Sequence, residues 1–296
     1  MNAPGTRFMD PFTDFAFKRI FGSEPNKDLL IDFLNSIFEG RKRIVDLVYN
    51  KNEHPGGTED SRTAIFDLLC TSEEGERFII EMQKVKQVYF RDRCVYYTSS
   101  LISEQGRRGE EEWNYRLKEV YLIGLMDFCF EDTMPDKYLH NIRLTDTETN
   151  RLFYKKLGYI FIEIPKFNKA EGELESTMDN WLYVLRNMHR LEKIPVFLKR
   201  SVFSKLFKIS EMSNLTQEEH ILYIRSQMRK WDYQNGLDTA REEGMNAGLH
   251  MGREGGLKAG REEERMRIAR KLKEQGVALA IISAASGLEV EQIELL

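Results

Sequence analysis

The chain has 296 residues, of which 41% are hydrophobic and 31% are charged, and its formal net charge is −4. This length is enough for one large domain with an appendage. No apolar run approaches the roughly 20 residues of a membrane span, and the N-terminal segment MNAPGTRFMD lacks the apolar stretch of a signal peptide, so we expect a cytoplasmic protein. The acidic balance excludes a generally basic surface and confines any contact with a polyanion to local clusters.

Several site chemistries have no support in the sequence. The cysteines Cys70, Cys94 and Cys129 are scattered among apolar residues, which predicts reduced core thiols rather than disulfides or a zinc site. The five histidines lack the spacing of a metalloprotease helix. Neither a serine-hydrolase elbow nor a Walker-type phosphate loop occurs.

The N-terminal part predicts two helices. The first covers residues 13–21 (TDFAFKRIF), with Thr13 as a suitable N-cap and Gly22 at its end. The second follows Pro25, where apolar residues recur at the helical period until Gly40.

Five runs rich in apolar residues predict strands. They cover residues 44–49, 63–70, 77–85, 120–130 and 159–164. The polar segment TSEEGE joins the second run to the third as a hairpin turn, whereas residues 120–130 are too apolar for an edge strand and are expected at the centre of the sheet. A helix over 87–105 and further helices from about Met178 flank these strands. The order predicts an α/β fold with a mixed sheet covered on both faces.

The C-terminal part has a different composition. Beyond Trp231, glycines recur every four residues from Gly244 to Gly260 among Arg and Glu. Each glycine inside a helix costs about 1 kcal/mol relative to alanine, so a helix here needs a partner or stays flexible. A self-association stalk and a charged linker both fit this pattern. We expect a domain over residues 1–232 and a helical tail over 233–296.

The C-terminal end predicts short helices separated by Gly276 and Gly287, a layout that superficially looks like a helix-turn-helix. Its segment EVEQIELL, in the position of a recognition helix, is acidic and would repel phosphates. We therefore expect this end to contact protein rather than DNA.

Two acidic residues lie in the predicted hairpin. Asp67 sits in the middle of the apolar run 63–70, where a carboxylate costs several kcal/mol unless it is paired or binds a metal. Strand alternation puts Glu81 and Gln83 on one face of the next run, and the hairpin can bring Asp67 beside Glu81. Neighbouring carboxylates repel, so a divalent cation is a natural partner, and the Met82 carbonyl can add a ligand. In the alternative structural interpretation, Asp67 pairs with a Lys or Arg, and Glu81 lies on a solvated face.

These residues resemble the D-x(n)-E-x-K signature of the PD-(D/E)XK nucleases. Asp67 and the run Glu81-Met82-Gln83 correspond to it, and TDFAFKRIFG is similar to the opening of the recombination-promoting, transposase-like branch of that superfamily. The similarity continues in the helix that contains Arg93, in the strand VYLIGLMDF and in the tail that ends in ASGLEVEQI. The resemblance implies a restriction-endonuclease-like fold with metal-dependent nuclease activity on DNA.

The resemblance also implies roles for single residues. Asp67 and Glu81 would hold Mg²⁺, for which Mn²⁺ can substitute, and Asp14 would be the auxiliary acid of the first motif. Gln83 stands where the general signature has Lys, although Gln is familiar at this place in the transposase-like branch. An amide can orient a water molecule but cannot take its proton, so a weakly active or inactive protein is an alternative.

Other lysines are poor substitutes for the missing one. Strand alternation points Lys84 and Lys86 to the opposite face from Gln83. Lys18 lies one helical turn after Asp14, so we expect an ordinary ion pair between them.

The leading hypothesis is a metal-dependent DNA endonuclease that hydrolyses phosphodiester bonds and promotes recombination or transposition. The basic residues of 193–208, with Arg91 and Arg93, would hold the DNA backbone without reading its sequence. The same basic segment also fits an amphipathic helix with Phe197, Phe203 and Phe207 buried. Two alternatives stay open, namely an inactive module of this fold that binds nucleic acid or assembles through its tail, and an endonuclease that acts on RNA.

Overall fold

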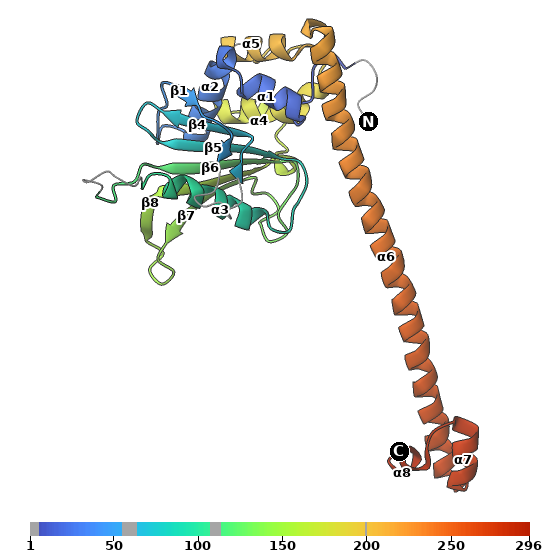
Figure 1. Cartoon of the computed structure of the whole chain (residues 1–296). Coiled ribbons are helices and arrows are strands. Elements are labelled where there is room, and N and C mark those ends of the chain that lie inside the picture. Colours follow the sequence, from blue (N-terminus) through green and yellow to red (C-terminus); the bar gives the residue numbers. More distant parts are fainter. Residues whose placement is uncertain (1–5, 55–63, 107–113, 199) are drawn as a thin grey trace. The chain divides into compact units, whose positions relative to one another are not determined.

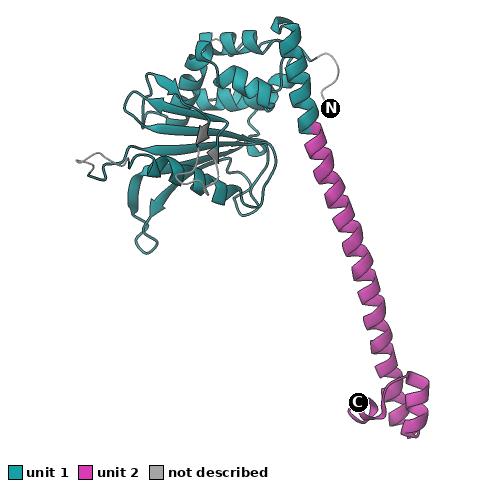
Figure 2. Cartoon of the chain, viewed as in Figure 1, with its two compact units in different colours: residues 1–230 teal, residues 231–296 magenta. Residues whose placement is uncertain are grey.

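The computed structural model describes residues 6–54, 64–106, 114–198 and 200–296. The chain divides into two compact units, residues 1–230 and 231–296 (Figure 2). The helices of the first unit are α1 (Asp14–Phe21), α2 (Lys27–Phe38), α3 (Phe90–Ser103), α4 (Thr177–Asn187) and α5 (Ser201–Ser210). Its strands are β1 (Leu47–Tyr49), β2 (Glu53–His54), β3 (Ala64–Ile65), β4 (Leu68–Ser72), β5 (Arg77–Gln83), β6 (Val120–Met126), β7 (Leu139–Thr145) and β8 (Leu152–Glu163). Helix α6 (Gln217–Glu274) begins in the first unit and continues into the second, which also holds α7 (Leu279–Ser286) and α8 (Val290–Glu294).

The predicted first helix forms as expected. Thr13 is the N-cap of α1, and its side chain accepts a hydrogen bond from the Ala16 N–H at 3.3 Å. Gly22 follows the helix, at a point where a Cβ atom would lie 2.7 Å from the Leu68 side chain. The close approach of α1 to β4 therefore needs glycine at this position.

The sheet has six strands in the order β1-β4-β5-β6-β8-β7. β1, β4 and β5 pair antiparallel, β5, β6 and β8 pair parallel, and β7 pairs antiparallel with β8. All seven residues of β6 are buried, which confirms that this run is central. Helix α3 is the crossover that a parallel connection from β5 to β6 requires. The mixed sheet flanked by helices is the predicted fold class.

Helices cover both faces of this sheet (Figure 1). The larger apolar core contains α1, α2, α4 and α5 together with one face of the strands, including Ile80 and Met82 of β5. The smaller core lies on the other face, where Ile79 packs with Phe90 and Cys94 of α3. Since side chains alternate along a strand, Glu81 and Gln83 share the α3 face with Ile79. All three cysteines are free thiols, as predicted.

The predicted strand over 63–70 is wrong as a continuous strand. Ala64 and Ile65 pair with β2 in a separate two-stranded sheet, and the chain bends at Asp67 before β4 begins. At the bend, a side chain replaces a neighbouring strand as the partner of the backbone. The Asn52 side-chain amide donates a hydrogen bond to the Asp67 carbonyl at 2.9 Å. Thr63 lies outside the described residues.

Strand β7 was not predicted. It lies at the edge of the sheet, and its sequence LHNIRLT leaves most of its side chains at least partly exposed. Such a strand carries neither a continuous apolar run nor a clear alternation. Its partner β8 extends from Leu152 to Glu163, well beyond the predicted run 159–164, because the pairing with β7 stabilises its polar first half.

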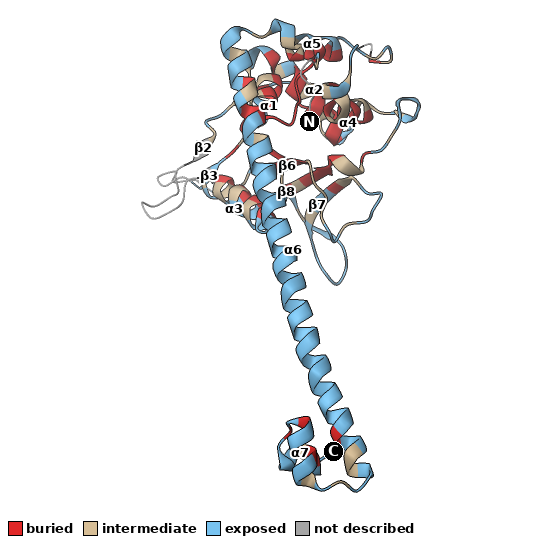
Figure 3. Ribbon diagram, turned by 90° about the vertical axis from the view of Figure 1, so that its right-hand side faces the viewer, coloured by how far each residue is buried: buried red, intermediate tan, exposed pale blue. Residues whose placement is uncertain are grey.

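The second unit consists of the exposed part of α6 followed by the two short helices α7 and α8. Helix α6 runs without interruption through the glycine repeat, where its residues are exposed (Figure 3). At the end of the chain, Ala269 near the end of α6 and Ile282, Leu288 and Ile293 beyond Gly276 are buried together and form a local core. Ile268 and Ile281, in contrast, are 40% and 61% exposed. In the described part of the chain, every helix is too short or too polar to cross a bilayer.

Gly124 of β6 gives a test of the fold around the site. It pairs with Glu81 in the parallel register, and an added Cβ would lie 2.8 Å from the Phe161 ring and 3.6 Å from Phe90. We expect Gly124→Ala to lower the free energy of unfolding by about 1–3 kcal/mol, because both rings must shift in a packed core. Urea denaturation measures this. Gly172→Ala is the control, since its Cβ would meet nothing within 4 Å; equal stability of the two variants would contradict the packing argument.

Candidate functional site

Asp67 and Glu81 lie side by side. The antiparallel register pairs Leu68 with Ile80, so the preceding residue on one strand faces the following residue on the other. The Met82 N–H donates to Asp67 Oδ2 at 2.8 Å, and the Asp67 N–H donates to Glu81 Oε1 at 3.2 Å. The bend at Asp67 therefore does not separate the two carboxylates, and backbone donors fix both of them.

The surroundings disfavour charge on both groups. Burial raises the pKa of Glu81 to about 8, and the neighbouring charge of Asp67 adds to the effect. Burial also raises the pKa of Asp67, against the hydrogen bond from Met82, and the charge of Asp14 raises it further. Within the described ranges, no Lys, Arg or His nitrogen comes within ion-pair distance of Asp67, whereas Arg93 Nη2 lies 4.0 Å from Glu81 Oε2. Arg93 thus offsets the negative charge of the pair only in part.

This donor set fits a divalent cation that keeps part of its water shell. Among the described residues, no three side chains of His, Cys, Asp or Glu converge as a metal cluster. Mg²⁺ is commonly bound through one or two carboxylates, with water and substrate phosphate as the other ligands. Asp67 and Glu81 supply two carboxylates, and the Met82 carbonyl adjoins them in the sequence. A site of this kind depends on the substrate to complete it.

Gln83 is held by its neighbours at both ends of its amide. Its Oε1 accepts a hydrogen bond from Arg93 Nη2 at 2.5 Å, and its Nε2 donates to the Val85 carbonyl at 2.8 Å. The sequence predicts that the Gln83 amide orients a water molecule. In the structure, both ends of this amide are already hydrogen-bonded within the protein. Arg93 comes from α3, and this residue, which we expect to contact DNA, lies next to Gln83 and Glu81.

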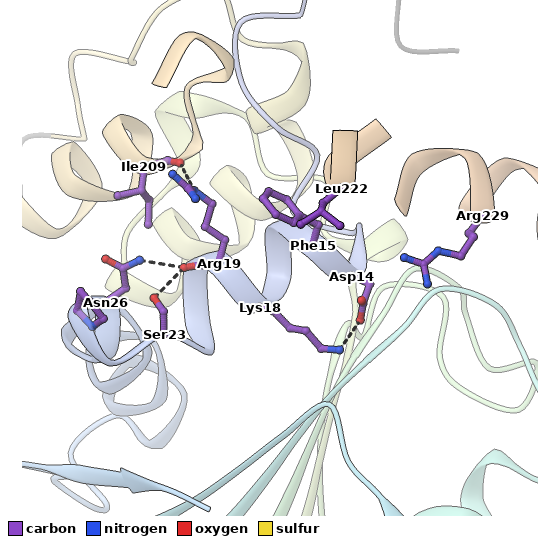
Figure 4. A pocket seen from close by; sticks show the side chains of 10 residues that line it. Asp14, Phe15, Lys18, Arg19, Ser23, Asn26, Ile209, Leu222 and Arg229 are labelled. Atoms are coloured by element: carbon purple, nitrogen blue, oxygen red, sulfur yellow. Dashed lines mark hydrogen bonds and ion pairs between the residues drawn. The ribbon is translucent and has the colours of Figure 1, made fainter. Parts of the chain in front are cut away.

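Asp14 lies at the edge of a pocket of about 550 Å³ beside the site (Figure 4). Lys18 Nζ is 3.0 Å from Asp14 Oδ1, which confirms the expected ion pair. Asp14 is close enough to raise the pKa of Asp67, so α1 adds a third acid to the neighbourhood. Lys18, Arg19 and Arg229 also line the pocket.

Further charged residues near the strand ends were missed from the sequence. Lys230 of α6 lies 2.8 Å from Asp10 and 3.6 Å from Asp127, which follows β6 directly. Burial raises the pKa of Asp127, while Lys230 opposes this shift. An acid directly after a buried parallel strand is a signal that could have identified Asp127. Lys230 gives no local signal, because it reaches the site from a distant helix.

Three of the cations expected to hold DNA, Arg91, Arg200 and Lys205, are paired within the protein. Arg91 forms two hydrogen bonds with Asp132, at 2.8 and 2.6 Å. Arg200 pairs with Asp32, and Lys205 pairs with Asp28. The aromatic residues of α5, Phe203 and Phe207, are fully buried, whereas Phe197 lies before the helix begins and is only partly buried. The structure thus favours the amphipathic-helix interpretation of this segment.

A family model described as PD-(D/E)XK nuclease family transposase matches residues 11–240. No curated protein and no solved structure matches the chain. The match includes the sheet, all the helices around it and the first part of α6. Together with the mixed six-stranded sheet, it shows that the chain belongs to the PD-(D/E)XK nuclease family transposases.

Proposed function

We propose that the protein is a metal-dependent endonuclease that hydrolyses phosphodiester bonds of DNA, in the service of recombination or transposition. The observation that carries this proposal is the close pair of carboxylates, the partly buried Asp67 and the buried Glu81, with no cation within ion-pair distance of Asp67 in the described ranges. A pair of this kind needs a partner of opposite charge or an extra proton. Membership of a nuclease family supports a nuclease function for this pair of carboxylates.

The metal would be Mg²⁺, or Mn²⁺ in its place, held by Asp67, Glu81 and the Met82 carbonyl. Bound there, it would polarise the phosphate, acidify water and stabilise the leaving oxygen. The chain itself fixes the two carboxylates, because the N–H groups of Met82 and Asp67 each hold one carboxylate oxygen. The other oxygen of each carboxylate remains for the ion. Asp14 adds negative charge from α1 and supports the role of an auxiliary acid.

DNA would approach past the pocket beside Asp14. Lys18, Arg19 and Arg229 line this pocket, so it attracts a polyanion more than an average part of this acidic chain does. Lys18 is partly neutralised by Asp14 and Arg19 by Glu219, whereas the Arg229 side chain is directed into the pocket (Figure 4). Contacts of this kind hold the backbone without selecting a sequence.

We also propose that residues 1–232 act as the nuclease domain and that the tail, 233–296, assembles copies of the chain. Exposed apolar side chains border the glycine repeat of α6, where Met245 is 61% and Leu249 is 66% exposed. Since Gly244 and Gly248 meet nothing within 4 Å, a second helix can approach this side closely. Packing of two such helices would offset the low helix propensity of glycine.

We predict that Asp67→Ala and Glu81→Ala each abolish nicking of supercoiled plasmid in Mg²⁺ or Mn²⁺, because one remaining carboxylate cannot hold the ion in position. Agarose gels resolve nicked from supercoiled plasmid. Glu74→Ala is the matched control, an exposed acid in the turn of the same hairpin, and it should cleave at the wild-type rate. Equal nicking by the wild type and both site variants would refute the proposal.

We predict that removing the tail after Asn235 lowers the mass per particle measured by light scattering, because the assembling helix is lost. A variant of the full chain that carries Met245→Glu and Leu249→Glu should show the same decrease, since buried carboxylates would oppose helix pairing. If all three proteins have the mass of one chain, the tail is a linker and the assembly proposal fails.

A further inference from the structure

Arg93 occupies an unusual position for a surface-helix arginine. Its Nη1 donates to Gln87 Oε1 at 2.7 Å and its Nη2 donates to Gln83 Oε1 at 2.5 Å. The guanidinium also lies over the rings of Phe90 and Tyr97, at 5.3 and 5.8 Å from their centroids. These contacts fix the plane of the guanidinium beside Gln83, at the end of β5.

These contacts do not use all the N–H donors of the guanidinium. Its Nε is buried and has no hydrogen-bond partner in the described structure. The nearest carboxylate oxygen, Glu81 Oε2, lies at 4.0 Å, which is too long for a hydrogen bond. The side chain as a whole is nevertheless 27% exposed, so a ligand can reach the exposed part of the guanidinium. A buried N–H without a partner is costly, and a guanidinium pairs most strongly with an anionic oxygen.

We infer that Arg93 supplies the positive charge of the site and binds the scissile phosphate of DNA, and that Gln83 serves to position it. This inference rests on the proposed function and assigns the cation of that site. A lysine at position 83 would extend from the α3 face of β5, where the Arg93 guanidinium is held against the Gln83 side chain. The guanidinium therefore takes the place that the signature gives to a lysine amine.

The arrangement explains why position 83 holds an amide. A lysine beside Arg93 would place two cations next to each other in a largely buried place, since Gln83 is only 9% exposed. Like charges at this distance repel. An amide oxygen instead accepts a hydrogen bond from the guanidinium without adding a second positive charge.

The test moves the charge between the two positions. We expect Arg93→Gln to slow plasmid nicking about 100-fold, as for the loss of one donor to a developing oxyanion. Arg93→Lys keeps a cation and should cleave at least about tenfold faster than Arg93→Gln. Gln83→Lys should be slower than the wild type because of repulsion. The double variant Gln83→Lys/Arg93→Gln exchanges amide and cation, and it should recover at least about tenfold over Arg93→Gln alone.

Arg77→Gln is the matched control. Arg77 lies at the other end of β5, has a side-chain exposure of 22%, and pairs at 2.8 Å with Glu104, the C-cap residue of α3. It should change the melting temperature as much as Arg93→Gln does while leaving nicking unchanged. Binding of a short duplex in Ca²⁺, followed by fluorescence anisotropy, should fall less than the nicking rate in Arg93→Gln, because the lost contact matters most as charge develops.

Three results would overturn the inference. Arg93→Gln could nick as fast as the wild type, Gln83→Lys could be faster than the wild type, or the double variant could be no faster than Arg93→Gln. A wild type that binds the duplex but never nicks in Mg²⁺ or Mn²⁺ would contradict the proposed function itself, and the inference would fall with it. The activity of the wild type therefore separates the two failures.

Discussion

Two carboxylates placed side by side in a poorly hydrated environment repel each other, and the fold holds Asp67 and Glu81 in that arrangement. Backbone N–H groups of Met82 and Asp67 fix one oxygen of each. The pKa of Glu81 rises to about 8 as a result of burial and of the neighbouring charge. The cation Arg93 lies near this pair and offsets part of the repulsion, but it does not neutralise the two charges.

The topology of the sheet places these groups together. β5 is central enough to be buried on both faces, so its last residues hold side chains in fixed positions. A parallel step from β5 to β6 requires a crossover, and α3 begins just beyond the end of β5. The first turns of α3 therefore return Arg93 to Gln83, ten residues after it in the sequence. Gly124 of β6 leaves room for the Phe90 and Phe161 rings behind Glu81.

The sequence predicted what local patterns determine. The N-cap Thr13, the central strand β6 and the proximity of Asp67 to Glu81 follow from capping, apolar runs and strand alternation, and the structure agrees with all three. The bend at Asp67 could not be predicted from the sequence, because a run of apolar residues does not show that the Asn52 side chain will donate a hydrogen bond to the Asp67 carbonyl. The sequence also does not show the contacts of Arg93 and Lys230, which depend on how α3 and α6 pack against the strand ends.

The central claim is that Asp67 and Glu81 together bind one divalent cation. Calorimetric titration of the purified protein with Mn²⁺ tests it without requiring cleavage. We expect binding that tightens as the pH rises toward about 8, because Glu81 must lose its proton before it can hold the ion. Asp67→Asn and Glu81→Gln should both abolish it. Mn²⁺ binding of wild-type strength in either variant, or no binding by the wild type at any pH from about 6 to 9, would contradict the account.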